Sequence, residues 1–212
     1  MATIKNGIHG AFSGKVGTVI GYVLNGQAIM RTQGERTTEP TPKELLNREK
    51  FTVSQKWLAP LTDFLRIGFK GYRPTFEGFV AAKSYNHKHA LQCTEENQFF
   101  IDPELVLVSF GQQPLPAEIA VESREAQELF FSWSKEKPYE YNDHVMALAY
   151  DLDSPQGKAR YHTSIGLRKD GSAVFKLEPS DKGRAFHIYI AFVSDDRKQR
   201  THSKYLGKLT II

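Results

Sequence analysis

The sequence predicts an α+β protein with an amino-terminal β-hairpin, two or three helices and then a seven-stranded β-sandwich. Three observations carry this prediction: an Asn-Gly pair between two strand-like runs, a helix-capping pattern at Thr41, and alternating apolar residues that recur from residue 118 onward. The 212 residues accordingly divide into two predicted domains, residues 1–112 and residues 117–212.

The hairpin is predicted by Asn25-Gly26, which separates strand-like runs at residues 16–24 and 27–32. Asn and Gly both tolerate the positive φ of a type I′ turn, the tightest connection of two antiparallel strands. A two-residue turn pairs Leu24 with Gln27 and so fixes which side chains share a face. One face is bulky and the other is nearly flat. The flat face carries Gly17, Val19, Gly21 and Val23 opposite Ala28, Met30 and Thr32.

The glycines of this flat face have two open interpretations. Glycine in a strand costs stability, so alternate glycines usually mark close approach by another backbone or an aromatic ring. The approach is either an internal packing contact or a contact with another subunit. Under the second interpretation the predicted protein-contact residues are Gly10, Gly14, Gly17, Val19, Gly21, Val23 and Met30. A phosphate-binding loop is disfavoured, because the glycine spacing is wrong and Val16 follows Lys15 where Ser or Thr is needed.

The predicted helical part begins with Thr41 as N-cap, Pro42 at the first helical position and Glu44 closing a capping box. A helix from Pro42 to about residue 58 follows, with a break near Pro60 and a second helix over residues 75–91. His87 and His89 lie two apart, so on a helix they point to nearly opposite sides and do not share a metal ion.

Residues 151–157 imitate the start of a calcium loop, but Pro155 takes a ligand position. No metal or cofactor is predicted.

The carboxyl-terminal domain is predicted from its apolar alternation. A short strand is expected within residues 101–110, and a proline-rich hinge within residues 113–117. Seven strand-like stretches follow: EIAVES, ELFFSWS, HVMALAYD, ARYHTSIGL, SAVFKLE, FHIYIAFVS and YLGKLTII. Seven short strands in under about a hundred residues are typical of a β-sandwich.

This domain resembles the fibronectin type III pattern. Trp133 lies on the second strand-like stretch, residues 177–179 read Leu-Glu-Pro, and an aromatic alternating strand precedes a hairpin near the end. Phe186 stands where that family usually has a tyrosine. The resemblance implies an immunoglobulin-like sandwich.

The whole chain is similar to a family of functionally uncharacterised proteins from Bacteroidota. The similarity rests on NGIHGAFSGKVGTVIGY, PTPKELLNREKF, LAPL, GFK, SYNHKHA, LVSFGQQP and IAFVSDDRKQRTHSKYLG. It implies a bacterial or phage-borne origin and a compact two-part architecture. It implies no activity, cofactor or catalytic residue.

The charges favour an asymmetric molecule. Residues 1–73 contain eleven Lys and Arg against five Asp and Glu, while the remainder contains seventeen against nineteen. A basic front indicates either nucleic-acid binding or attraction between two protein surfaces. For nucleic acid, the predicted phosphate contacts are Lys15, Arg31, Arg36 and Arg48.

The sequence contains no recognisable catalytic motif, and Gly-x-Ser-x-Gly in particular is missing. We therefore expect a non-enzymatic structural or assembly protein that binds copies of itself or a protein partner, with nucleic-acid binding as the alternative. No small-molecule substrate is inferred. The single cysteine, Cys93, leaves no internal disulfide. We recognise no signal peptide and no membrane span, so we expect cytoplasmic synthesis, with a virion or a surface assembly as a final location.

Overall fold

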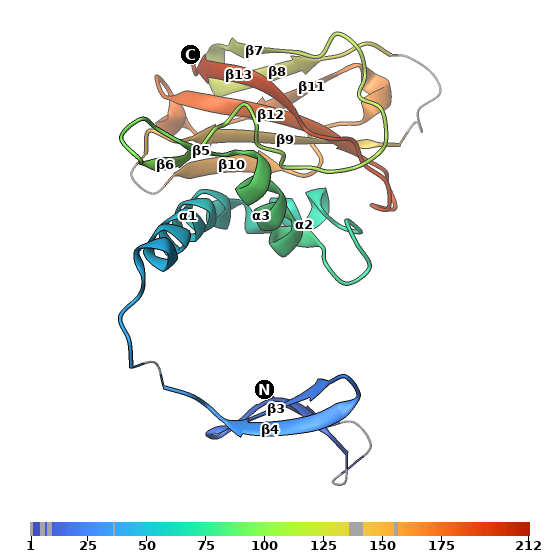
Figure 1. The fold of residues 1–212 in the computed structure, drawn as a ribbon. Coiled ribbons are helices and arrows are strands. Elements are labelled where there is room, and N and C mark those ends of the chain that lie inside the picture. Colours follow the sequence, from blue (N-terminus) through green and yellow to red (C-terminus); the bar gives the residue numbers. More distant parts are fainter. Residues whose placement is uncertain (1, 5–6, 8–9, 36, 136–141, 155–156) are drawn as a thin grey trace. The chain divides into compact units, whose positions relative to one another are not determined.

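The computed structural model describes residues 2–4, 7, 10–35, 37–135, 142–154 and 157–212 (Figure 1). Two positions named above, Arg36 and Pro155, lie outside these residues. The chain forms two compact units, residues 1–44 and residues 45–212, which we call the amino-terminal unit and the carboxyl-terminal unit.

The amino-terminal unit is a four-stranded antiparallel sheet in the order β1-β2-β3-β4. Its strands are β1 (Thr3–Ile4), β2 (Phe12–Val16), β3 (Val19–Leu24) and β4 (Gln27–Thr32). Leu24 lies opposite Gln27 and the ladder continues without a slip, which confirms the predicted hairpin. Asn25 and Gly26 have φ values of 50° and 82°, as a type I′ turn requires.

The predicted strand over residues 16–24 is wrong at its start. Gly17 and Thr18 form a turn between β2 and β3, and Gly17 has a φ of 58°. This left-handed conformation suits glycine, because it has no Cβ to clash with the backbone. Gly17 therefore serves the turn and does not lie on the flat face.

Three helices follow, and all but the first three residues of the first helix belong to the carboxyl-terminal unit. They are α1 (Pro42–Leu58), α2 (Thr62–Gly68) and α3 (Gly78–His89), with a short 3₁₀ turn η2 (Ala59–Leu61) between the first two. The capping box is confirmed: the Thr41 N–H donates to the Glu44 carboxylate at 2.8 Å, and the Glu44 N–H donates to the Thr41 hydroxyl at 3.4 Å. The predicted break near Pro60 is also confirmed, because the helix tightens there before α2 begins.

Nine strands follow the helices in the described part of the unit. They are β5 (Leu91–Cys93), β6 (Phe99–Ile101), β7 (Ala120–Arg124), β8 (Glu128–Ser132), β9 (His144–Asp151), β10 (Lys158–His162), β11 (Ser172–Lys176), β12 (Ala185–Val193) and β13 (Lys204–Thr210). Each of the seven predicted stretches overlaps one strand, with ends that agree to within a few residues.

The strand expected within residues 101–110 does not continue past Ile101. The backbone there bonds elsewhere instead: the Val108 N–H donates to the Ser203 hydroxyl, and the Phe110 N–H donates to the Gly68 carbonyl, both at 2.9 Å.

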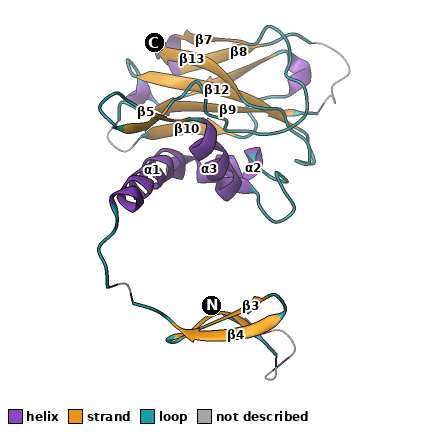
Figure 2. Cartoon of the chain, in the orientation of Figure 1, coloured by secondary structure: helices purple, strands orange, loops and turns teal. Residues whose placement is uncertain are grey.

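The carboxyl-terminal unit has three layers (Figure 2). A three-stranded sheet, β11-β8-β7, packs on a four-stranded sheet, β10-β9-β12-β13, and the helices cover the other face of the four-stranded sheet. Strands β9 and β12 are therefore buried on both faces. The strand counts are three and four, and the small hairpin β5-β6 is a separate two-stranded sheet.

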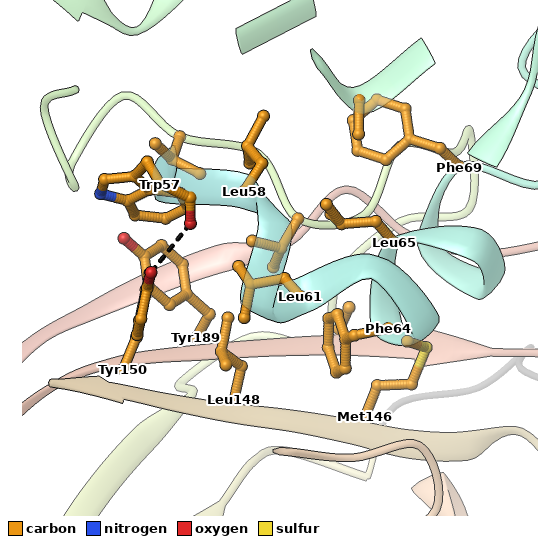
Figure 3. Close-up of a cluster of buried hydrophobic side chains, with 14 of the residues drawn as sticks. Trp57, Leu58, Leu61, Phe64, Leu65, Phe69, Met146, Leu148, Tyr150 and Tyr189 are labelled. Carbon is orange, nitrogen blue, oxygen red and sulfur yellow. Dashed lines mark hydrogen bonds between the residues drawn. The ribbon is translucent and has the colours of Figure 1, made fainter. Parts of the chain in front are cut away.

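The helices and the four-stranded sheet share one hydrophobic core (Figure 3). Leu58, Leu61 and Phe64 are fully buried against Met146 and Leu148 of β9. The Tyr150 hydroxyl donates to the Trp57 carbonyl at 2.8 Å, and the two rings meet edge to face with centroids 4.9 Å apart. Independent folding of residues 117–212 stays a prediction. The shared core joins residues from both predicted domains, so separating the two would expose its apolar side chains.

No helix within the described part of the chain combines the length and the hydropathy needed to cross a membrane.

Candidate functional site

One face of the amino-terminal sheet is almost wholly apolar. Residues directly opposite in an antiparallel ladder point to the same side. The pairing therefore puts Gly14, Gly21 and Met30 in one row across β2, β3 and β4. Neighbouring rows extend the same surface, which we call the apolar face. It consists of Ile4, Phe12, Gly14, Val16, Val19, Gly21, Val23, Ala28, Met30 and Thr32.

The apolar face has no cover among the described residues of its own unit. Met30 is 68% exposed, and Ile4, Val16 and Val23 are each more than half exposed. Among the same described residues, Gly21 alone is buried. Burial of a hydrophobic face is a main source of stability for a small sheet in water. The apolar face is therefore the main candidate for an interaction surface.

Gly21 is required by an internal contact. A Cβ atom at this position would lie 2.5 Å from the Phe12 ring and 2.6 Å from the Phe12 carbonyl oxygen. Gly14 has a φ of 117°, so β2 departs from regular strand geometry beside this contact. A glycine within a strand predicts close approach by a ring or a backbone, and both are found at Gly21. The ring and the carbonyl both belong to Phe12 of the neighbouring strand β2.

The structure brings five of the seven predicted contact residues onto the apolar face: Gly14, Val19, Gly21, Val23 and Met30. Gly10 and Gly17 lie outside it. The Gly10 N–H closes a bend by donating to the Gly7 carbonyl at 3.0 Å, and Gly17 occupies the β2–β3 turn. Whether these residues contact another chain stays a prediction.

Phe12, Val16 and Ile4 were not predicted from the sequence. Phe12, Gly14 and Val16 are alternate residues of β2, and alternate residues of a strand lie on one face. Recognising β2 as a separate strand would therefore place Phe12 and Val16 on the face of Gly14.

The described residues of the predicted nucleic-acid set are divided between the two units. Lys15 and Arg31 flank Ile20 in one row of the opposite face of the sheet, and the Arg31 guanidinium lies 5.7 Å from the Tyr22 ring centre. Arg48 is exposed on α1 in the other unit. Arg36 lies outside the described residues.

A second feature is a hollow of about 600 Å³ in the carboxyl-terminal unit. Three segments line it: residues 70–72 after α2, residues 110–114, and residues 198–200 between β12 and β13. The Gln113 N–H donates to the Arg200 carbonyl at 3.0 Å. Gly111 permits this close approach, because a Cβ there would lie 1.9 Å from the Arg200 carbonyl oxygen. We call this the basic hollow, after Lys70, Lys198 and Arg200.

A Ser, a His and an Asp also meet at the end of the sandwich. His144 contacts the Ser164 hydroxyl through Nδ1 at 2.8 Å and the Asp195 carboxylate through Nε2 at 3.0 Å. In serine hydrolases the carboxylate is buried and bonds Nδ1, while the serine bonds Nε2. Here the two nitrogens are exchanged and the Asp195 side chain is 70% exposed. The arrangement does not support hydrolysis, and the absence of enzymatic activity stays a prediction.

Other acidic and histidine side chains are engaged with neighbours. Asp151 accepts from the backbone N–H groups of Asp153 and Ser154 and pairs with Arg184, so the carboxylate that imitates a calcium ligand is already used. His87 contacts the Ser54 hydroxyl at 2.9 Å. Over the described ranges, no three His, Cys, Asp or Glu side chains gather as a metal-binding group.

Comparison with known proteins identifies one family. No curated protein matches the chain. The model of a family described as "Family of unknown function (DUF6266)" matches residues 11–207. The match begins at β2 and ends within β13, so it includes most of the apolar face and the whole basic hollow. The chain therefore belongs to DUF6266, a family of unknown function.

Proposed function

We propose that this protein is a non-enzymatic assembly protein whose apolar face packs against the apolar face of a second copy of the chain. The observation that carries the proposal is the four-stranded sheet that leaves its apolar side chains exposed and buries only Gly21 among its described residues. Two such sheets stacked about 10 Å apart make a small β-sandwich, which buries what each sheet exposes.

A second copy suits this face chemically. None of the ten residues that make up the face is charged, so two copies meet without like-charge repulsion. An interface with two-fold symmetry needs one patch that complements itself, and an uncharged, almost wholly apolar face meets that need. The edge strand β4 also has no ladder neighbour on its outer side within the described sheet. That edge offers a second route for larger assemblies.

The size of the apolar face limits the expected affinity of the dimer. Strands β3 and β4 contain six residues each, β2 contains five and β1 contains two, so the face outlines roughly 300 Å² per sheet and two stacked sheets bury on the order of 600 Å². This is less than the roughly 1,000 Å² of a stable specific interface, so a single pair of faces associates weakly. We therefore expect dissociation constants in the micromolar range and an assembly that strengthens when many copies are joined.

We infer a fibronectin type III-like fold for the carboxyl-terminal sandwich. The strand orders β11-β8-β7 and β10-β9-β12-β13 support this inference, as does Trp133 buried between the sheets, whose indole N–H donates to the Arg168 carbonyl at 2.7 Å. Such domains commonly serve as structural modules, which agrees with an assembly role.

The chain offers a matched pair of variants for testing the dimer. Val23 and Leu24 are neighbours in β3, are 54% and 53% exposed, and point to opposite faces. Val23→Lys places a charge in the stacked interface, where burying it without a partner costs several kcal/mol. We expect sedimentation velocity between about 1 and 100 μM to show a dissociation constant raised at least ~100-fold for Val23→Lys. Leu24→Lys should dimerise like the unmodified protein.

Two results would contradict the proposal. One is an unmodified protein that stays monomeric at the highest concentration. The other is a Leu24→Lys variant that dissociates as readily as Val23→Lys, because this would assign the contact to the opposite face or to no particular face.

Nucleic-acid binding remains the second candidate, and one observation favours it. Residues 1–34 contain no acidic residue, and Lys15 and Arg31 share a row on the face opposite the apolar one. Replacing Lys15, Arg31 and Arg36 together by Gln should abolish retardation of DNA or RNA and flatten its salt dependence. Unmodified protein that retards neither nucleic acid at low salt would end this candidate.

A further inference from the structure

The basic hollow contains a buried positive charge that is in ion-pair contact with no carboxylate of the described residues. Arg200 is 5% exposed, and its guanidinium donates to the backbone carbonyls of Arg197 and Lys198 at 2.7 and 3.1 Å. Its Nε has no hydrogen-bond partner, and no ion pair holds the side chain within the part of the chain that the structure describes. Burying a cation this way is costly unless an anion compensates for it.

The nearest acids are already engaged. Glu77 accepts the Gly71 N–H at 2.7 Å, and Asp196 accepts the Ser194 hydroxyl while pairing with Lys198 at 3.4 Å. Burial lowers the pKa of Arg200, and the fields of Glu77 and Asp196 oppose that shift. No Asp or Glu is among the described residues that line the hollow.

The hollow is also lined by lysine ammonium groups and glutamine amides. Lys70 and Lys198 line the hollow together with Gln112, Gln113 and Gln199. The Gln113 Oε1 is buried without a hydrogen-bond partner among the described residues, although its Nε2 lies 3.4 Å from Gln199. A hollow of about 600 Å³ is of the size that small organic ligands occupy.

The aromatic wall is held in place before any ligand arrives. Phe110 packs edge to face on Tyr72 with centroids 4.8 Å apart, and the His202 ring lies 4.7 Å away on another side. A wall fixed by its neighbours loses little entropy when a ligand binds, and this favours a preformed site.

We propose that the basic hollow binds a small organic oxyanion, with Arg200, Lys70 and Lys198 facing its carboxylate or phosphate group. Guanidinium and ammonium groups form their strongest hydrogen bonds with such oxyanions. The glutamine amides then orient the uncharged part of the ligand. This site lies within the carboxyl-terminal unit, so it is independent of the dimer proposed above.

The test is calorimetric titration of the full chain with phosphate and with citrate, at ionic strength matched by sodium chloride. Binding of both probes identifies a general oxyanion site, and binding of one alone identifies a phosphoryl or a carboxylate site. In each case the Lys70→Ala/Lys198→Ala double variant should weaken binding at least tenfold. These two side chains are exposed, so we expect the double variant to fold.

Lys176→Ala on β11 is the matched control, since Lys176 is exposed and does not line the hollow. This variant should bind phosphate and citrate with the affinity of the unmodified protein. Arg200→Gln should abolish binding if circular dichroism shows that the variant is folded. Two results overturn the proposal: neither probe binds beyond the chloride control, or binding persists unchanged in the double lysine variant.

Discussion

At the scale of single residues, Gly21 lies on the candidate interface and also packs closely against Phe12 of the neighbouring strand. Phe12 occupies the space that a side chain at Gly21 would need, so glycine at this position is explained without a partner. The exposed neighbours Val23 and Met30 have no such internal explanation. The contact role that we propose therefore rests on the exposed apolar side chains and does not depend on the glycines.

Gly21→Val should destabilise the amino-terminal sheet directly. The new side chain would begin 2.5 Å from the Phe12 ring and 2.6 Å from a backbone oxygen, which cannot move aside as a flexible side chain can. We expect a loss of about 1 to 3 kcal/mol in opening free energy, the usual cost of overpacking. Amide hydrogen exchange within β2, β3 and β4 measures it. Gly34→Val is the control, because no atom lies within 4 Å of its added Cβ. Unchanged protection in Gly21→Val would contradict this packing.

At the scale of elements, the sequence predicts the turns, helix caps and strands that depend on neighbouring residues. The Asn25-Gly26 turn, the Thr41 capping box and the seven alternating stretches all lie where the sequence places them. The predicted strand over residues 16–24 joins only Val16 of β2 to β3 and leaves the rest of β2 unpredicted, because Gly17-Thr18 is a weaker turn signal than Asn-Gly.

The basic hollow could not be predicted in the same way. Its walls join Gly111 to Arg200, which lie far apart in the sequence and meet only through tertiary packing. Six of the ten residues of the apolar face were predictable, since the hairpin register follows from a two-residue turn. The rest depends on β1 and β2, whose pairing is set by contacts outside the hairpin.

A buried carboxylate ties the segment before β12 to strand β10. Asp181, before β12, accepts from Lys158 at 2.5 Å and from Arg160 at 2.9 Å, both on β10, and is itself fully buried. Burial by itself raises the pKa of Asp181, but hydrogen bonds from Lys158 and Arg160 outweigh it and lower the pKa below its ordinary value. A lowered pKa in the folded state means that the ionised carboxylate stabilises the fold above about pH 4, the unfolded value.

Asp181→Asn should therefore reduce the free energy of unfolding by roughly 3 kcal/mol at neutral pH, because it leaves two cations without their buried partner. The difference from the unmodified protein should begin to shrink as the pH falls below about 4, where the Asp181 carboxylate of the unfolded chain becomes protonated, and it should continue to shrink until the pH passes the lowered pKa of the folded state. Urea unfolding at pH 7 and at pH 3 measures both values. A difference that is constant with pH would show that the charge of Asp181 contributes nothing.

At the scale of the whole molecule, the helices and the sandwich form one compact unit. Their shared core is centred on Leu61, Phe64 and Leu148, while the described residues between β4 and α1 are mostly exposed and form neither helix nor strand. Exposed, irregular backbone is where proteases cut first.

Limited proteolysis should thus cut within residues 33–41 and leave a stable fragment that begins near residue 42 and ends at Ile212. Mass spectrometry of the digest identifies the fragment. A first stable fragment that begins near residue 117 would instead support the two domains predicted from the sequence, and would show that the helical core is dispensable for the sandwich.

The stacking of two apolar faces is the central claim, and cross-linking tests it most directly. In a Cys93→Ser background, which removes the one native cysteine, Met30→Cys puts a thiol on the apolar face and Arg31→Cys puts one on the opposite face. Stacked sheets lie about 10 Å apart, within reach of a short bismaleimide. We predict covalent dimers from Met30→Cys and almost none from Arg31→Cys. Equal yields from the two variants, or no dimer from Met30→Cys, would contradict the stacked arrangement.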